Sequence, residues 1–296
     1  MHKRGRVVVV GDVMNDILVV PEGALVVGSD RRATIRILPG GSGANQAAWL
    51  AHFGVDAALV ARVGAADHAR LAAEFSAGLV DARLGADTQA PTGTLVTMVA
   101  PDGERSFFTD RGANDRLSTA DMPESLLDGA GFIEVSAYAL VASGPRRAVL
   151  DFLRTAQARA IPVSVDPASA SFLEEIGPRD FLEWTRGAAI CFANREEAKV
   201  LTGETDLDAQ FRALLEFYRL VVIKCGGEGA EMRNPDGCWR AAAPAGPVVD
   251  TTGAGDAFLA GFLAARLRGA SPDRVLKSAV EAGALATRQL GGRPPR

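Results

Sequence analysis

The chain has 296 residues, of which 48% are hydrophobic and 23% are charged. This composition is typical of a folded protein with a large core and excludes disordered and fibrous classes. The 36 acidic and 32 basic residues give a formal charge of −4, and no basic block occurs, so nucleic acid is not an expected partner. The three cysteines form no CxxC pair, which argues against a disulfide framework and a cysteine-rich zinc site.

The amino terminus is basic and then apolar, as a signal peptide would be. Gly11, Asp12, Asn15 and Asp16 interrupt the apolar run before it reaches a membrane-engaging length, and no 18-residue apolar stretch occurs elsewhere. We therefore expect a cytoplasmic protein without a membrane partner.

Short apolar runs rich in β-branched residues predict buried strands along the whole chain. Each run is nearly continuous rather than alternating, which is typical of parallel strands covered on both faces by helices. The predicted strands are 7–10, 58–63, 132–135, 161–165, 188–193 and 220–224.

Helical segments lie between these strands. A helix over 44–53 is expected to end at Gly54, Ser143 is expected to cap a second helix with Pro145 in its first turn, and 257–267 predicts a buried third helix. The repeated strand–helix–strand order predicts a three-layer α/β/α core with a mostly parallel central sheet. No linker, repeat or low-complexity tract occurs, so we expect one domain over residues 1–296.

One region departs from this order. Residues 92–99 and 105–108 are strand-like runs joined by Ala-Pro-Asp-Gly, which predicts a β-hairpin, and 33–38 is a further strand-like run. These segments predict a small sheet outside the core, which is either a lid over a site or a surface hairpin without a role in function. We expect the lid segments to span about 17–38 and 92–113.

The segment Asp250–Asp256, DTTGAGD, precedes the predicted helix over 257–267. The small residues 253–255 allow a ligand to approach the backbone closely, and the first amides of a helix favour an anion. Asp256, placed at this anion site, can accept the proton of a hydroxyl that attacks a phosphoryl group. No GxxxxGK[ST] loop of the Walker type occurs.

The string DTTGAGDAFLAGFL (250–263) resembles the second signature of the ribokinase-like, or PfkB, carbohydrate kinases, and GGSGANQAAWLAHFG (40–54) resembles the first. Both occur in the family's order, so the resemblance covers essentially the whole chain. It implies a ribokinase-like fold with a β-sheet lid. It also implies an ATP-dependent kinase that transfers the γ-phosphate to a hydroxyl of a small sugar or sugar acid, with ATP and Mg2+.

The resemblance also implies roles for individual residues. Asp256 is the catalytic base, and the amides of Gly253, Ala254 and Gly255 form the anion hole for the transferred phosphate.

Asp12 and Asp16 follow the first predicted strand, and the carboxyl ends of parallel strands are where open α/β sheets bind ligands. A carboxylate accepts hydrogen bonds from two adjacent sugar hydroxyls, although both residues could also lie in a solvated loop. The resemblance implies that Asp16 binds the acceptor hydroxyls together with Gly41 and Asn45, and we place Asp12 at the same site.

Asn194 and Glu197 follow the strand predicted over 188–193 and resemble the family's NxxE motif, which organises magnesium and the nucleotide phosphates. Because Mg2+ prefers oxygen ligands and keeps several waters, Glu197 is expected to hold it partly through water. By itself, Asn-x-x-Glu at a helix start is also a helix cap.

The resemblance implies further contacts to the nucleotide and to a monovalent cation such as K+. Relatives carry a glycine-containing strand-to-loop element beside ATP, and Asp250 and Thr252 are the implied ligands of the cation. The residues expected beside the nucleotide are Lys224, Gly226, Gly229 and Thr252.

The run 92–115 resembles the family's lid, whose closure excludes water. Phe107 and Phe108 alternate across a strand, so one is expected to face the acceptor and the other the outer or dimer side, or either lies in the core. Arg111 pairs either with the carboxylate of a sugar acid or with groups near Asp110. Lid sheets in this family often pair, so we expect a homodimer through the lid.

Departures from the family pattern leave the acceptor open. Ribokinases usually have Asn where this chain has Met14, and a Glu in the segment where this chain has Ser136 and Tyr138. A nucleoside kinase with the same machinery and a non-catalytic sugar or nucleotide sensor are therefore the alternatives. His2, His52 and His68 have no expected catalytic partner.

Overall fold

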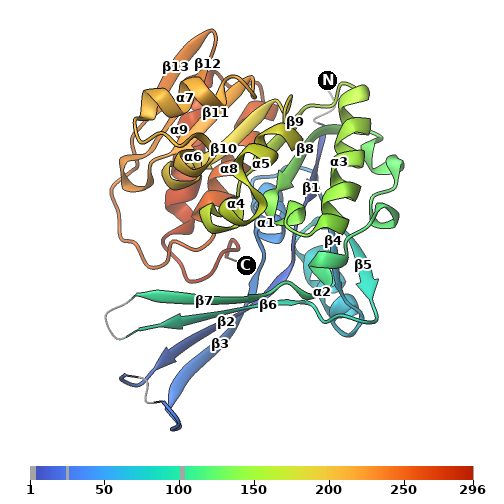
Figure 1. Cartoon of the computed structure of the whole chain (residues 1–296), viewed down its shortest axis with the longest axis vertical. Helices are drawn as coiled ribbons and strands as arrows, with labels where there is room; N and C mark the ends of the chain where they lie inside the picture. The colour runs from blue at the N-terminus through green and yellow to red at the C-terminus, as the bar shows by residue number, and fades with distance from the viewer. Residues whose placement is uncertain (1–4, 25–26, 101–103, 296) are drawn as a thin grey trace.

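The computed structural model describes residues 5–24, 27–100 and 104–295 (Figure 1). It contains a nine-stranded sheet in the order β13-β12-β11-β10-β9-β8-β1-β4-β5. The strands from β5 to β11 pair in parallel, and β12 and β13 are antiparallel additions at one edge. The strands are β1 (Arg6–Val10), β4 (Ala57–Gly64), β5 (Val80–Asp87), β8 (Ala130–Ser136), β9 (Val163–Asp166), β10 (Ile190–Asn194), β11 (Leu220–Lys224), β12 (Ala230–Asn234) and β13 (Gly237–Ala241).

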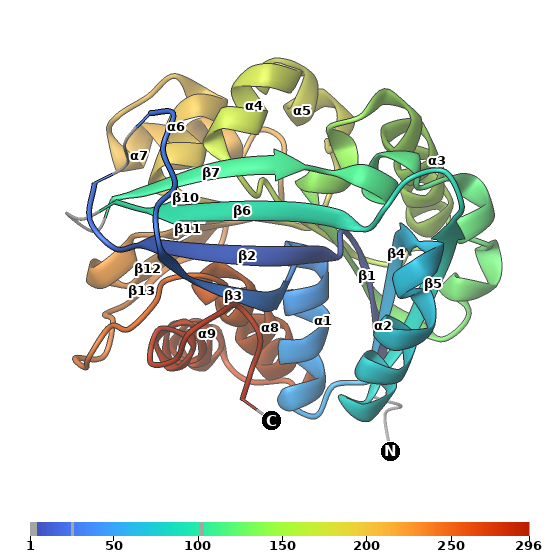
Figure 2. The same cartoon turned by 90° about the horizontal axis from the view of Figure 1, so that it is seen from below.

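Helices cover both faces of this sheet (Figure 2). One face carries α1 (Ser42–His52), α2 (Ala65–Ala77), α8 (Ala254–Leu267) and α9 (Pro272–Ala286). The other carries α3 (Ser143–Ala158), α4 (Ala170–Ile176), α5 (Pro178–Trp184), α6 (Arg195–Thr202) and α7 (Leu207–Leu214). Short 3-10 turns lie at 112–116, 119–121, 124–127, 137–140 and 226–228. The predicted three-layer, mostly parallel α/β/α architecture is confirmed.

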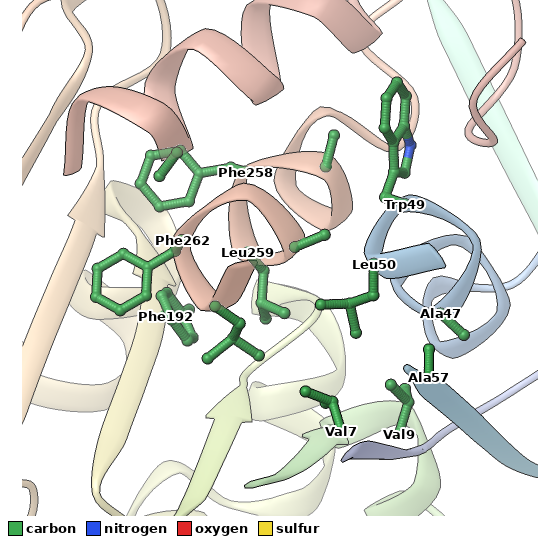
Figure 3. Close-up of a cluster of buried hydrophobic side chains, with 14 of the residues drawn as sticks. Val7, Val9, Ala47, Trp49, Leu50, Ala57, Phe192, Phe258, Leu259 and Phe262 are labelled. Carbon is green, nitrogen blue, oxygen red and sulfur yellow. The ribbon is translucent and has the colours of Figure 1, made fainter. Parts of the chain in front are cut away.

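Each central strand contributes to two hydrophobic cores because its side chains alternate between two covered faces. In β11, Val222 belongs to the core that contains α1, α2, α8 and α9, whereas Val221 and Ile223 belong to the core that contains α3 to α7. Figure 3 shows the first core, where Phe192 and Phe262 meet edge to face with ring centroids 4.9 Å apart. This double burial explains why the strand sequences are apolar without alternation.

The predicted core elements agree with the structure in kind, with some differences in extent. The strand expected over 161–165 begins at Val163, because Pro162 has no N–H to donate to a neighbouring strand. The first predicted helix begins at Ser42 and stops before Gly54, whose φ is +73°. The sequence analysis did not identify β5, β12 and β13.

The expected cap of α3 is wrong. Ser143 is itself the first helical residue, and the capping position belongs to Ala142, which makes no side-chain capping bond. Because the backbone of Ser143 is already helical, its hydroxyl does not occupy the position from which a side chain caps the first turn.

A second, four-stranded sheet has the order β3-β2-β6-β7 and stands apart from the large one (Figure 1). Its strands are β2 (Met14–Pro21), β3 (Ala33–Gly40), β6 (Gly93–Val99) and β7 (Arg105–Asp110). The antiparallel pairing of β6 with β7 matches the predicted hairpin, whose turn residues 101–103 lie outside the described residues. The sequence analysis did not identify β2. Asp16 lies in this strand and not in a solvated loop.

None of the helices within the described ranges combines the length and apolar character that a bilayer span requires.

The contact between Phe192 and Phe262 predicts a stability effect. Replacing Phe262, which is fully buried, with alanine leaves a cavity between α8 and the sheet, so Phe262→Ala is expected to lower the free energy of unfolding by about 3–5 kcal/mol in urea denaturation. Phe107→Ala is the matched control, because Phe107 is 60% exposed and its loss should change stability by about 0.5 kcal/mol or less. Equal losses in the two variants would contradict this description of the core.

Candidate active site

A cavity of about 900 Å³ lies where the small sheet, the carboxyl ends of the parallel strands and the start of α8 meet. Carboxyl ends of parallel strands are the usual ligand-binding edge of such sheets. Except for Asp250, every residue predicted for the site lines this one cavity: Asp12, Asp16, Gly41, Asn45, Arg111, Asn194, Glu197, Lys224, Gly226, Gly229, Thr252, Gly253, Ala254, Gly255 and Asp256.

Asp256 lies in the first turn of α8 with 9% of its surface exposed. Its carboxylate accepts hydrogen bonds from three side chains of α1: Ser42 Oγ at 2.7 Å, Asn45 Nδ2 at 3.0 Å and Gln46 Nε2 at 3.2 Å. The sequence analysis missed Ser42 and Gln46. Their spacing from Asn45 places all three on one helix face, which is the signal that could have identified them.

Burial raises the pKa of Asp256 to about 7, with a further contribution from the negative charge of Asp166. The hydrogen bonds from Ser42 and Asn45 and the charge of Lys224 act in the opposite direction. A carboxyl group with a pKa near neutrality can both accept and release a proton in the range where proteins work.

The start of α8 offers free backbone amides to the cavity. Gly253 has a left-handed backbone (φ 73°), and a Cβ there would lie 2.5 Å from the Cα of Gly292, so glycine is required. Ala254 N–H donates to Thr251 O at 3.2 Å. Within the described chain, the amides of Gly253, Gly255 and Asp256 have no acceptor. The predicted anion hole is therefore only partly free, because the amide of Ala254 already makes a turn.

Asp16 lines the part of the cavity that the small sheet provides, in β2 opposite Leu38. Its carboxylate rests against Gly40, where a Cβ would approach Asp16 Oδ1 to 2.1 Å. Among the described residues no group donates a hydrogen bond to Asp16 Oδ1. Burial, followed by the charge of Asp12, raises the pKa of Asp16 to about 7, and Arg293 opposes this rise. The carboxylate is thus desolvated and able to accept a ligand hydroxyl.

Asp12 and Arg111 form a buried group next to Asp16. Asp12 Oδ1 accepts the amide of Gly43 at 3.1 Å, and its other oxygen lies 3.8 Å from Arg111 Nη1. Arg111 also binds Asp115 at 2.9 Å and the carbonyl of Tyr138 at 2.9 Å. The sequence left two alternatives for Arg111, a ligand carboxylate or groups near Asp110. In the structure Arg111 forms ion pairs within the protein, and its partners are Asp115 and Asp12 rather than Asp110.

Aromatic side chains occupy part of the same end. Tyr138 and Phe172 line the cavity and meet edge to face with ring centroids 5.4 Å apart. Phe107 and Phe108 are 60% and 58% exposed and do not line it, so neither lies in the core. As the alternation predicts, Phe107 is on the face of the small sheet that carries Thr109 into the cavity, and Phe108 is on the opposite face. The tip of the small sheet carries them away from the cavity.

Asn194 and Glu197 form a capping box at the start of α6, as the alternative interpretation of this motif expects. Asn194 Oδ1 accepts the amide of Glu197 at 2.9 Å, and the Glu197 carboxylate accepts the amide of Asn194 at 2.8 Å. Burial raises the pKa of Glu197 to about 7, a rise that Lys224 opposes. The pair therefore caps a helix and lines the cavity at the same time.

Lys224 ends β11 and lies 3.4 Å from Asp166, which ends β9. Burial lowers the pKa of Lys224, but the charges of Asp166, Glu197 and Asp256 outweigh it and raise the pKa overall. Asp166 was missed by the sequence analysis, although its place after the apolar run 161–165 was a usable signal. One lysine thus lies among three carboxylates that line the cavity.

Most of the remaining wall is apolar and rich in small residues, and Thr287 and Arg288 are its polar members. A Cβ on Gly229, whose φ is +103°, would lie 2.0 Å from the carbonyl oxygen of Ala241, so the loop after β11 needs glycine there. The sequence analysis did not identify the rest of this wall, which is formed by Ala243, Pro244, Ala245, Gly246, Pro247, Val248, Val280, Gly283 and Ala284.

Asp250 supports the loop before α8. Its Oδ1 accepts the amide and the hydroxyl of Thr252 at 3.0 and 2.8 Å, and its Oδ2 accepts the amide of Gly291 at 3.0 Å. In the part of the chain that the structure describes, no group of three or more His, Cys, Asp or Glu side chains could hold a metal ion. An ion held here would need water or a bound ligand to complete its coordination.

The two described histidines lie outside the cavity. His52 packs against Trp49, and the ring of His68 lies 3.0 Å from the carbonyl of Leu84, while His2 falls outside the described residues.

The raised pKa of Asp256 predicts a pH-dependent stability. Between its ordinary value of 3.8 and about 7, the unfolded chain releases this proton and the folded protein keeps it, so stability falls as pH rises through this window. Asp256→Asn removes the effect, and the variant should gain up to about 4 kcal/mol relative to the wild type between pH 4 and pH 8.

Urea denaturation at both pH values measures this gain, and the exposed Asp236→Asn serves as the control. A difference between the Asp256→Asn variant and the wild type that does not change with pH would contradict the assignment.

The comparisons with known proteins identify the family of this chain. Residues 4–296 match the family model described as pfkB family carbohydrate kinase. The chain is 33% identical over 258 residues to an ATP-dependent ribose-1-phosphate kinase of Halopiger xanaduensis, covering 86% of this chain and 82% of that one. It is 29% identical to a cytidine kinase of Thermococcus kodakarensis, with 93% of each chain covered.

Among solved structures, Arabidopsis thaliana ribokinase complexed with ribose and ATP matches with a TM-score of 0.82, 26% identity and coverage of 97% of this chain and 94% of that one. The fold predicted from the two signatures is thus confirmed. The chain belongs to the pfkB family of carbohydrate kinases and is an ATP-dependent phosphotransferase.

Proposed function

We propose that this protein transfers the γ-phosphate of ATP to a hydroxyl group of a small sugar or sugar acid. The observation that carries the proposal is the position of the Asp256 carboxylate, which lies beside free backbone amides in the same cavity as the desolvated Asp16. On this proposal the chain is one kinase domain, and the small sheet acts as its lid and limits the access of water.

In the proposed reaction Asp256 accepts the proton of the attacking hydroxyl. The three donors on α1 fix its carboxylate, so little reorganisation is needed when the proton moves. The amides of Gly253 and Gly255 face the negative charge that develops on the phosphoryl group. The amide of Ala254 joins them by giving up its hydrogen bond to the carbonyl of Thr251 for one to the phosphoryl group.

Asp16, with Gly41, Asn45 and Asp12 around it, binds the other hydroxyls of the acceptor. The ion pairs of Arg111 with Asp115 and Asp12 already balance its charge. A carboxylate on the acceptor would therefore lie near the negative charges of Asp12 and Asp16, while the positive charge of Arg111 is already used in its ion pairs. Within the proposed class, this charge distribution favours an uncharged sugar over a sugar acid.

We place the nucleotide along the apolar wall 243–248, with Gly226, Gly229 and Thr252 close to it. Lys224 can exchange Asp166 for a phosphate oxygen. The oxygen atoms of Glu197, Asn194 and Asp166 fit a hard cation bound partly through water, and Mg2+ there would neutralise phosphate charge. We extend the proposal to a monovalent cation such as K+ at Asp250 and Thr252.

A nucleoside is the second candidate for the acceptor. The Tyr138–Phe172 pair beside Asp16 could stack on a nucleobase. The relatives are named for ribose, ribose 1-phosphate and cytidine, and such names fit either acceptor. A screen of ADP release over pentoses, hexoses, keto-deoxy acids and nucleosides, with and without Mg2+ and K+, separates the two. If none of these acceptors causes ADP release, the result would support a non-catalytic sensor.

Asp256→Asn tests the proposed base. The amide cannot accept the proton, so acceptor-dependent ADP release is expected to fall by about 10²–10⁴-fold or more, while the KM for MgATP changes little. Steady-state kinetics with the best acceptor of the screen measures this. Asp236→Asn, on the surface, should keep wild-type turnover, and near-normal turnover in Asp256→Asn would defeat the proposed mechanism.

We also propose that the protein is a homodimer joined through the small sheet. The strand register places Ile37, Ile17, Val96 and Phe108 in one row and Ile35, Val19 and Met98 in the next. These seven residues lie on the outer face of the sheet, opposite the face that carries Asp16, Leu95 and Thr109 into the cavity. Ile35, Ile37 and Phe108 are 62%, 73% and 58% exposed, which is unusual for a continuous apolar row.

Sedimentation of Ile37→Lys tests the dimer. A lysine on the outer face would need to be buried in the interface without a partner, so the variant should sediment as a monomer at concentrations where the wild type is a dimer. Leu79→Lys is the matched control, because Leu79 is 83% exposed and follows α2 outside the small sheet, and this variant should stay dimeric. A monomeric wild type would overturn this proposal and leave the chemistry unaffected.

A further inference from the structure

The segment 289–293, which follows α9, crosses behind the proposed acceptor and phosphate sites. Its backbone is fixed at several points: Gly291 N–H donates to Asp250 Oδ2 at 3.0 Å, and Gly292 O accepts the indole N–H of Trp49 at 2.8 Å. Gln289 Nε2 donates to the carbonyl of Arg293 at 2.5 Å. The segment is thus tied to α1 through Trp49 and to the loop before α8 through Asp250.

The packing of this segment leaves no room for a side chain at Gly292. A Cβ on Gly292 would lie 2.3 Å from Asn45 Nδ2, and a Cβ on Gly253 would lie 2.5 Å from the Cα of Gly292. Asn45 is one of the donors to Asp256. The segment therefore touches both the residues that hold the base and the start of the anion site.

Arg293 extends from this segment toward the acceptor end. Its side chain is 11% exposed, and Nη1 forms an ion pair with Glu74 Oε1 at 2.8 Å. Nη2 donates to the carbonyl of Gly40 at 3.3 Å, and the guanidinium carbon lies 4.7 Å from the centre of the Phe75 ring. The guanidinium is thus held between α2 and the end of β3.

Gly40 connects Arg293 to the acceptor site. The Asp16 carboxylate rests against Gly40, and the next residue, Gly41, lines the cavity with a φ of +91°. The charge of Arg293 also acts on Asp16. It lowers the pKa of that carboxyl, which burial and the negative charges of Asp12 and Asp250 raise. The guanidinium therefore favours both a fixed position and an ionised form of the acceptor-binding carboxylate.

We propose that Arg293 is a positioning residue of the acceptor site, which holds the Gly40 carbonyl and through it the relative placement of Asp16 and Gly41. The inference rests on the proposed function for the role of Asp16, and the geometry itself stands without it. The described contacts of Arg293 with Glu74, Gly40 and Phe75 involve no residue placed at the nucleotide and not Asp256. The loss of Arg293 should therefore affect the acceptor and leave MgATP binding in place.

A simple structural anchor is the competing explanation, in which Arg293 matters only through its ion pair with Glu74. Four variants separate the two explanations. Arg293→Met removes the charge and the bond to Gly40, Arg293→Lys keeps the charge, and Glu74→Gln removes the ion pair and leaves the guanidinium. Arg154→Met is the control, because Arg154 is 75% exposed and pairs with Asp151 on the same helix.

The first measurement is steady-state kinetics with D-ribose and cytidine as probes. In Arg293→Met the KM of the phosphorylated probe is expected to rise about tenfold or more, while the KM of MgATP changes less than about twofold. Arg293→Lys should recover part of the loss, and Glu74→Gln and Arg154→Met should stay close to the wild type. An unchanged acceptor KM in Arg293→Met, or identical losses in Arg293→Met and Glu74→Gln, would overturn the inference.

The second measurement does not depend on activity. Hydrogen exchange of the amides of residues 40–46 is compared without ligand, and Arg293→Met should exchange about tenfold faster there while β8 to β11 are unchanged. Unchanged exchange at 40–46 would overturn the inference. If the wild type phosphorylates neither probe, these two acceptors are excluded for the proposed function, and the exchange measurement alone decides the role of Arg293.

Discussion

The burial of one carboxylate beside the amino end of a buried helix is the constraint on which the rest of this structure depends. A desolvated Asp256 is costly to ionise, and the protein compensates with hydrogen bonds from α1 and with the positive charge of Lys224. Both compensating groups come from elements that only tertiary packing brings next to Asp256. The proposed chemistry is therefore inseparable from the hydrophobic cores that position α1, α8 and the end of β11.

The parallel sheet explains why the polar groups converge on one edge. Strands that run in the same direction bring their carboxyl ends together, so Asp166, Asn194 and Lys224 meet although they follow three separate apolar runs. The same edge receives the chain where β1 leads into β2, which brings Asp16 from the small sheet to the cavity. An antiparallel arrangement would have divided these residues between two opposite edges.

The small sheet has two faces with different surroundings. One face carries Asp16 and Thr109 to the cavity, and the other carries the apolar rows that include Ile37 and Phe108. Because side chains alternate along a strand, the strands that enclose the acceptor must also present the opposite face to solvent or to a partner. The proposed lid and the proposed dimer interface are therefore two consequences of one set of strands.

Much of the fold and part of the site followed from local sequence signals. Continuous apolar runs predicted the doubly covered strands, and the glycines before 257–267 with Asp256 predicted the anion site, because these depend on neighbouring residues. The pairing of Asp256 with Ser42, which is 214 residues away, depended on how α1 packs against α8, and the contact of Arg293 with Gly40 depended on the path of a segment without periodic pattern. The engagement of the Ala254 amide and the ion pairs of Arg111 likewise required coordinates. Sequence patterns determine which residues can do chemistry, whereas only the packed chain decides which of them meet, because hydrogen bonds and desolvation act over a few ångströms in space rather than along the sequence.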